Sequence, residues 1–205
     1  KIYVDKTGLL LYTNGALGTV QKNICVSRPR RFGKSMAANM LAAYYGRGCD
    51  SSAIFKEYQI AKSPTYREHL NKYDVIFLNI QNFLSDTGSV DGLLEAVNHW
   101  VSEEVFRAYP DIRYQDRSRL TMMLQNIFAE CGSRFVFIID EWDCVFREHR
   151  NDFSAQKKYL DFLRNLLKDR TYVALAYMTG ILPVKKYGTH SALNMFDEYS
   201  MTNPK

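Results

Sequence analysis

Continuous apolar runs alternate along this chain with segments whose apolar residues recur at helical spacing. Such runs predict strands that are buried on both faces of a sheet. The predicted strands cover residues 24–26, 75–80, 135–139 and 172–178. The predicted helices cover residues 36–45, 64–70, 119–129 and 155–167, with a longer one from Ser89 or Asp91 to residue 107. This alternation predicts an α/β fold with a mainly parallel sheet and right-handed crossovers.

A short helix is also expected at the start of the chain. Asp5 or Thr7 could cap it, and it should end near Leu11. Asn14-Gly15 follows as a turn signal.

A basic loop follows the first predicted strand, with the sequence Arg28-Pro29-Arg30-Arg31-Phe32-Gly33-Lys34-Ser35. A loop between a strand and a helix directs backbone N–H groups and the positive helix end at an anion. Lys34 would then reach the outer phosphates of a nucleoside triphosphate, and Ser35 would bind Mg²⁺. The residues expected to surround the phosphates are Arg30, Arg31, Phe32, Gly33, Lys34, Ser35 and Met36.

Arg28 stands where the general phosphate-loop pattern has its first glycine. Because arginine tolerates a positive φ poorly, we expect a departure from ordinary loop geometry near the β-phosphate. The alternative interpretation of the segment is a helix start whose basic side chains are merely solvated.

Two carboxylates, Asp140 and Glu141, come directly after the third predicted strand. Ligands of open α/β sheets collect at the carboxyl ends of the strands, so both acids are expected beside the loop. Asp140 would hold Mg²⁺, usually through water, and Glu141 would be the general base that polarises the attacking water. The alternative is a surface turn in which Asp140 caps the next helix. Asp143 is expected to cap the following helix, and the alternative is that it joins Asp140 and Glu141 in a second metal site.

The order of the predicted strands separates classes of phosphate-loop proteins. A complete strand over residues 75–80 lies between Lys34 and Asp140 along the chain. This order is typical of the additional-strand class, so the sequence predicts a three-layer P-loop NTPase fold of AAA/ASCE-like type. Thr179 ends the last predicted strand, where that class places a side chain that senses the γ-phosphate. The alternative for Thr179 is an ordinary hydroxyl at a strand end.

Five stretches of the chain carry a family resemblance. They are Tyr3-Val4-Asp5-Lys6-Thr7, the loop from Ser27 to Ser35, Ile139-Asp140-Glu141-Trp142-Asp143, Thr179-Gly180-Ile181-Leu182-Pro183 and Ser191-Ala192-Leu193-Asn194-Met195-Phe196. They resemble the predicted AAA-ATPase-like family, in which the arginine-rich loop without its first glycine is typical. The resemblance implies the ATPase domain of a multidomain bacterial protein, often with a C-terminal restriction-endonuclease-like nuclease domain.

Composition narrows the class of protein. The 205 residues are 46% hydrophobic and 24% charged, which fits a single domain over residues 1–205 with a sizeable core. We expect this chain to be an N-terminal fragment of a longer protein. Because the sequence shows neither an apolar run of about 18 residues nor a signal peptide, we expect a cytoplasmic protein without membrane contact. The cysteines and histidines lack metal-ligand spacing, so no zinc site is predicted.

The sequence bears on three further partners: a guanine nucleotide, a nucleic acid and a second copy of the chain. Asn71-Lys72-Tyr73-Asp74 fits the guanine-reading pattern of GTPases, but it precedes a strand, so we interpret it as a helix-to-strand turn. The net charge of +5 is mild, and no basic stripe is visible, which leaves direct nucleic-acid binding open. A homo-oligomer in which Arg147 or Arg150 acts as an arginine finger also stays open.

Together these features predict Mg²⁺-dependent ATP binding and hydrolysis by a module of a larger protein that could process nucleic acid. The alternative is a nucleotide-gated switch that binds ATP with negligible hydrolysis. Both functions use Lys34, Ser35 and Asp140, and the presence of Glu141 favours hydrolysis. A small-molecule kinase fits less well, because no acceptor pocket with a cluster of lid arginines is recognisable.

Overall fold

The computed structural model of the chain describes residues 5–184 and 193–200, so parts of two stretches with the family resemblance, Tyr3-Val4 and Ser191-Ala192, lie outside the described residues. Five strands form one parallel sheet in the order β2-β3-β4-β1-β5. The strands are β1 (Asn23–Ser27), β2 (Asp74–Asn79), β3 (Phe135–Asp140), β4 (Val173–Gly180) and β5 (Asp197–Ser200).

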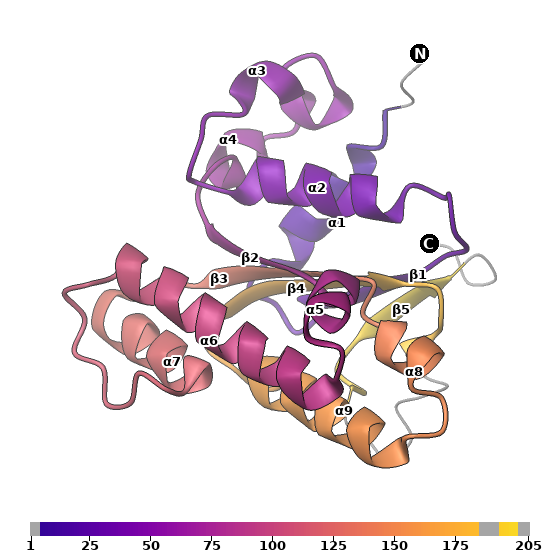
Figure 1. Cartoon of the computed structure of the whole chain (residues 1–205). Coiled ribbons are helices and arrows are strands. Elements are labelled where there is room, and N and C mark those ends of the chain that lie inside the picture. The colour runs from indigo at the N-terminus through magenta and orange to yellow at the C-terminus, as the bar shows by residue number, and fades with distance from the viewer. Residues whose placement is uncertain (1–4, 185–192, 201–205) are drawn as a thin grey trace.

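Helices cover both faces of this sheet, which gives the predicted three layers (Figure 1). One face carries α1 (Gly8–Ala16), α2 (Lys34–Tyr45), α3 (Ser52–Phe55), the 3₁₀-helix η1 (Gln59–Lys62) and α4 (Tyr66–His69). The other face carries α5 (Ile80–Thr87), α6 (Val90–Ala108), α7 (Leu120–Cys131), α8 (Cys144–Glu148) and α9 (Phe153–Leu167).

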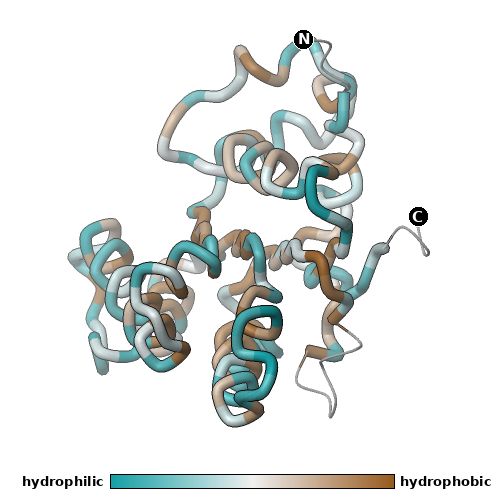
Figure 2. The backbone as a smooth tube through the Cα atoms, turned by 45° about the vertical axis from the view of Figure 1, so that its right-hand side comes forward, coloured by the Kyte–Doolittle hydropathy of each residue, from teal (hydrophilic) through white to brown (hydrophobic). Residues whose placement is uncertain are grey.

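Two apolar cores lie on opposite faces of the sheet, because successive side chains of a strand point to opposite sides. In β3, Phe135, Phe137 and Ile139 pack into the core under α5–α9, whereas Val136 and Ile138 pack against α1–α4. Every residue of β3 and β4 is buried, as expected for strands in the middle of a parallel sheet. Figure 2 shows this apolar centre of the chain in brown.

The strand order confirms the additional-strand class. β4 lies between β1, which leads into the basic loop, and β3, which ends in Asp140. The register aligns Thr179 with Val26 of β1 on one side and with Asp140 of β3 on the other. The carboxyl ends of these three strands therefore meet at one edge of the sheet. The fifth strand, β5, was not predicted.

The expected turn at Asn14-Gly15 is wrong, because α1 continues through both residues to Ala16. The Asn14 side chain is buried, where it donates hydrogen bonds to Tyr44 Oη (3.0 Å) and Thr65 Oγ1 (3.1 Å). These tertiary contacts satisfy the amide that would otherwise favour a turn. The predicted caps are also wrong, since Thr7 occupies the N-cap position without a side-chain cap.

The segment with the guanine-reading pattern is a turn, as interpreted from the sequence. Asn71 has a φ of 55°, and its Nδ2 donates to the carbonyl oxygens of Gly46 (2.7 Å) and Ala43 (3.2 Å). Its amide therefore holds the α2 end against the start of β2. Asp74, the last residue of the pattern, pairs with Arg47 at 2.6 Å.

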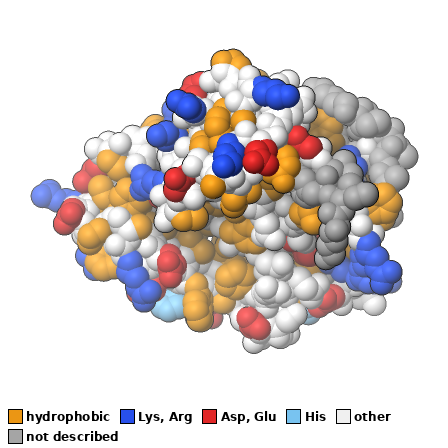
Figure 3. Space-filling model, turned by 90° about the horizontal axis from the view of Figure 1, so that it is seen from above, with side chains coloured by type: hydrophobic (Ala, Val, Ile, Leu, Met, Phe, Trp, Pro, Cys, Tyr) orange, Lys and Arg blue, Asp and Glu red, His pale blue; other side chains and the backbone are white. Residues whose placement is uncertain are grey.

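All four cysteines are free, and burial raises the pKa of Cys144 to about 12, so its thiol stays protonated at neutral pH. None of the helices in residues 5–184 and 193–200 combines the length and apolar character needed to cross a bilayer. On the face formed by α1–α4, Figure 3 shows basic and acidic side chains interspersed with hydrophobic ones.

Candidate active site at the carboxyl edge of the sheet

The loop between β1 and α2 is anchored at its start and has two residues with positive φ. The backbone N–H of Arg28 donates to the carbonyl of Gly180 at 3.0 Å, which ties the loop start to the end of β4. The φ of Arg28 is not positive, whereas Arg31 and Gly33 have φ angles of 69° and 75°. Arg28 therefore does not adopt the left-handed conformation that a glycine at this position would allow, and that conformation falls on Arg31 and Gly33 instead.

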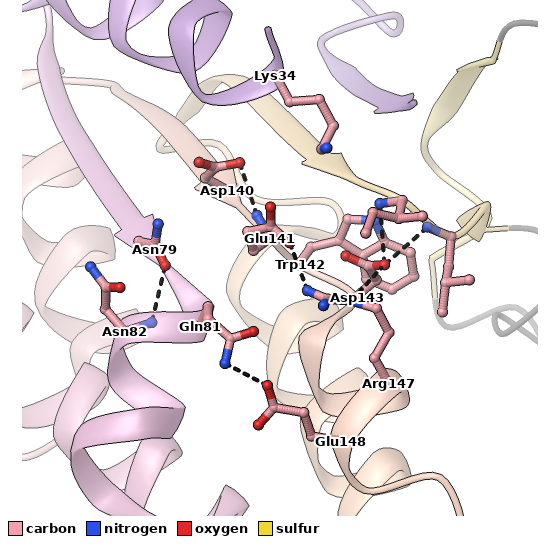
Figure 4. Close-up of polar contacts among 12 residues, drawn as sticks. Lys34, Asn79, Gln81, Asn82, Asp140, Glu141, Trp142, Asp143, Arg147 and Glu148 are labelled. Carbon is pink, nitrogen blue, oxygen red and sulfur yellow. Dashed lines mark hydrogen bonds and ion pairs between the residues drawn. The ribbon is translucent and has the colours of Figure 1, made fainter. Parts of the chain in front are cut away.

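Lys34 begins α2, and its side chain projects from this helix toward the end of β3 (Figure 4). The residue is buried, and its Nζ donates a hydrogen bond to the carbonyl of Pro29 at 3.2 Å. The loop therefore holds the ammonium group over its own backbone. Ser35 and Met36, in the first turn of the helix, are exposed.

Asp140 and Thr179 lie side by side at the ends of β3 and β4. Both are buried, with exposed fractions of 1% for Asp140 and 0% for Thr179. Asp140 Oδ1 accepts a hydrogen bond from the Glu141 N–H at 3.0 Å. Thr179 Oγ1 is buried without a hydrogen-bond partner among the described residues. Because a buried hydroxyl without a partner is unfavourable, this atom is a candidate contact for a ligand.

Glu141 is held by an arginine of its own chain. Its Oε2 pairs with Arg147 Nη2 at 2.6 Å, and Arg147 is only 15% exposed (Figure 4). The backbone of Glu141 has a φ of 53°, which is unfavourable for a residue with a side chain and typical of functional sites. In this conformation Arg147 is directed at Glu141 within the chain rather than outward as an arginine finger.

Asp143 does not cap α8, contrary to the prediction. It occupies the N-cap position, but its Oδ2 accepts hydrogen bonds from the N–H groups of Ile181 (3.1 Å) and Leu182 (2.9 Å). The same oxygen lies 3.3 Å from Arg147 Nε. A buried carboxylate needs such partners, and these join the segment after β4 to the arginine that holds Glu141.

Gly180 allows this close approach, and we expect Gly180→Ala to destabilise the fold. A Cβ at this position would lie 2.6 Å from Asp143 Oδ1 and 2.7 Å from the Trp142 ring, and both side chains are buried. The overpacking should lower the free energy of unfolding by about 1–3 kcal/mol, as measured by urea denaturation. Gly48→Ala is the matched control, because nothing lies within 4 Å of a Cβ built at that position. Equal stability of the two variants would contradict this account.

A cavity of about 580 Å³ opens beside the loop on the α1–α2 side of the sheet. It is lined by Lys6, Gly8, Leu9, Tyr12, Ile24, Val26, Arg28, Phe32, Gly33, Lys34, Ala37, Tyr177 and Tyr199. Burial raises the pKa of Tyr177, so its phenol is neutral. The cavity thus has a cationic end at the loop and an aromatic and aliphatic remainder. Most of its lining was not predicted, because it joins α1 and β5 to the loop.

The residues predicted to bind Mg²⁺ have suitable chemistry for that ion. Magnesium binds oxygen ligands and keeps several waters, so a hydroxyl and one carboxylate suffice from the protein. Ser35 is accessible, and no described residue donates a hydrogen bond to the second carboxylate oxygen of Asp140. The described residues contain no cluster of three or more acids, histidines or cysteines that would suit another type of metal site.

The structure brings Lys34, Asp140 and Glu141 to one edge of the sheet (Figure 4), and the strand register places Thr179 beside Asp140 at the same edge. Arg30 and Arg31 lie exposed in the adjoining loop, and Phe32 is 48% exposed. The predicted residues thus lie in one region at the carboxyl edge of the sheet.

Residues 1–189 match the sequence family described as "Predicted AAA-ATPase". A curated protein of Azotobacter chroococcum mcd 1, named "Uncharacterized protein in vnfD 5'region", is 25% identical over 206 residues, and the match covers 97% of this chain. The chain spans 37% of the length of that relative. The Aeropyrum pernix ORC2 protein, solved as ADPNP–ADP complexes, gives a TM-score of 0.48 at 11% identity, covering 94% of this chain and 46% of that one.

Proposed function

Because the chain belongs to the predicted AAA-ATPase family, we propose that it binds ATP with Mg²⁺ and hydrolyses it. One observation carries this proposal: the buried and unpartnered Thr179 hydroxyl lies beside Asp140 at the sheet edge toward which Lys34 projects. A cation, a carboxylate and a free hydroxyl at one edge are the groups that a triphosphate with its metal would engage.

Each residue has a role in this proposal. The N–H groups of the loop and of the first turn of α2 surround the phosphates, and Lys34 leaves Pro29 to bind the outer ones. Ser35 and Asp140 hold Mg²⁺, which neutralises phosphate charge. Thr179 donates its hydroxyl to the γ-phosphate.

Glu141 is the proposed general base, and it takes a proton from the attacking water. In this structure Glu141 Oε2 faces Arg147 Nη2 at 2.6 Å, so that oxygen is occupied by the guanidinium rather than turned toward a water. Hydrolysis therefore requires that Glu141 leave Arg147, at least in part.

The nucleobase is proposed to enter the cavity beside the loop. Its aromatic and aliphatic lining, which includes Leu9 and Tyr12 of α1, suits a planar base. Tyr12 packs edge to face with Tyr199 of β5, with ring centroids 5.6 Å apart. Adenine is proposed over guanine, because Asn71, the first residue of the guanine-reading pattern, is used inside the turn before β2.

Coupling to a larger protein extends this proposal beyond the chain. The match covers only 37% of the curated relative, so a longer protein has room for another domain. A nuclease-like C-terminal domain and assembly into a homo-oligomer are proposed partners of this ATPase module.

A second function is favoured by one observation, the ion pair between Glu141 and Arg147. If this pair persists when nucleotide binds, the module would act as a switch that binds ATP with negligible hydrolysis. The phosphate-binding residues would be the same, and only the use of Glu141 would differ.

The test is a titration of the protein with ATP and GTP, with and without Mg²⁺, followed by measurement of phosphate release. We expect ATP to bind more tightly than GTP, and Mg²⁺ to strengthen the binding, because Ser35 and Asp140 contact it. Phosphate release distinguishes the enzyme from the switch. Absence of ATP binding in either metal condition would refute both functions.

A further inference from the structure

The segment Asp5-Lys6-Thr7 has no role in the function proposed above, although it lies next to the loop. Asp5 anchors one end of the segment. Its Oδ1 accepts hydrogen bonds from Thr7 N (2.8 Å) and Thr7 Oγ1 (2.7 Å), while its Oδ2 accepts from Gln59 N (2.9 Å). The Asp5 carboxylate thereby fixes the segment to η1.

Thr7 anchors the other end. Its side chain is fully buried, and its Oγ1 also accepts a hydrogen bond from the N–H of Ile60 at 3.2 Å. The side chains on either side of Lys6 are thus committed to holding the backbone, and Lys6 has a fixed starting point from which to extend.

Lys6 itself extends over the basic loop. A Cβ built on Gly33 would lie 3.2 Å from Lys6 Nζ, so the ammonium group sits against the residue that precedes Lys34. Lys6 is exposed and lines the same cavity as Lys34. Within the described part of the chain, Lys6 has no ion pair with an acidic side chain.

The charge around the cavity is one-sided. Lys6, Arg28 and Lys34 are cationic, and no acidic side chain is found among the described residues that line it. Like charges around one cavity repel one another, and an anion bound between them relieves the repulsion. Lys6 precedes α1, and Leu9 and Tyr12 of α1 line the part of the cavity proposed for the base. The anion beside Lys6 is therefore expected to be a phosphate close to the base rather than the γ-phosphate.

We propose that Lys6 is a second phosphate-binding lysine, which contacts the phosphates nearest the base. This inference rests on the proposed nucleotide binding and adds a residue from outside the loop. Lys34 serves the outer phosphates, whereas Lys6 serves the α- and β-phosphates that ATP and ADP share. Loss of Lys6 therefore weakens the binding of both nucleotides equally, and loss of Lys34 weakens ATP binding more than ADP binding.

The experiment compares Lys6→Met with Lys157→Met, which removes the same charge from an exposed position on α9, across the sheet. Calorimetric titration with ATP–Mg²⁺ and with ADP gives the dissociation constants. We expect Lys6→Met to weaken the binding of both nucleotides by roughly ten-fold, which is the scale of one hydrogen bond between charged groups. Lys157→Met should bind like the parent protein. Thr7→Val, which removes the hydroxyl anchor, should weaken the binding of ATP and of ADP equally, but by less than Lys6→Met does.

Lys34→Met is titrated in parallel, so that a failure of the proposed nucleotide binding can be distinguished from a failure of the proposed role of Lys6. If the parent binds neither nucleotide, the proposed function fails first. If Lys34→Met weakens ATP binding but Lys6→Met binds both nucleotides as Lys157→Met does, only the role of Lys6 is wrong. If Lys6→Met lost affinity for ATP alone, the proposed role of Lys6 would also be overturned. Unfolding midpoints check each variant, and Lys6→Arg, which keeps the charge, should retain affinity within a few-fold of the parent.

Discussion

Glu141→Gln is expected to lower the rate of ATP hydrolysis by about 10²–10⁴-fold, the usual contribution of a positioned general base. Glutamine keeps the size of the side chain, and its carbonyl oxygen can still accept a hydrogen bond from Arg147, which pairs with Glu141 at 2.6 Å. The local structure and the binding of ATP–Mg²⁺ should therefore persist. The measurement is phosphate release at saturating ATP in the full-length protein.

Glu148→Gln is the matched control for this prediction. Glu148 is exposed at the end of α8, where its Oε1 accepts a hydrogen bond from Gln81 at 2.5 Å. This variant makes the same chemical change a few residues away and should hydrolyse ATP at the parental rate. If Glu141→Gln is as fast as its parent, Glu141 is not the base. If the parent itself shows no turnover, the switch is the better account.

Lys34→Met should weaken ATP binding by roughly 10- to 100-fold, because a charged hydrogen-bond donor to phosphate is lost. Methionine preserves most of the apolar stem of this buried side chain, so the fold should survive. Isothermal titration calorimetry gives the affinity, and a parental unfolding midpoint establishes that the variant is folded. A folded variant with unchanged affinity would show that the loop does not bind the triphosphate.

Much of the fold could be predicted because its central strands are continuous apolar runs. β3 is buried at every position, and its sequence shows this directly. The placement of Asp140 beside Thr179 followed from the rule that parallel strands end at the same edge. These features depend on local sequence and on sheet topology, and both can be read without a structure.

The polar contacts around the site could not be predicted in the same way. Asp143 looked like a helix cap, but it binds the N–H groups of Ile181 and Leu182, which are distant in the sequence. Arg147 looked free to act on another subunit, but it pairs with Glu141. For Asp143 a tertiary partner competes with the local cap that the sequence suggests, and for Arg147 the sequence does not reveal the ion pair within the chain.

β5 was missed for a related reason. It has four residues, Asp197–Ser200, with a polar start and no buried position. A short edge strand of this kind lacks the apolar periodicity that identifies the central strands. Trp100, which lies at helical spacing with the core positions of α6, is 67% exposed, so periodicity alone also overestimates burial.

The position of β1 in the sheet has a consequence for the order in which the chain folds. Ile24 pairs with Tyr177 on one side and with Asp197 on the other, so both neighbours of β1 are made long after it during synthesis. Contacts of such high sequence separation form slowly, because a long loop must close first. Until β4 emerges, the apolar edge of β1 has neither partner and is exposed to aggregation. Among the five described strands, the one that leads into the loop is thus synthesised first and completed last.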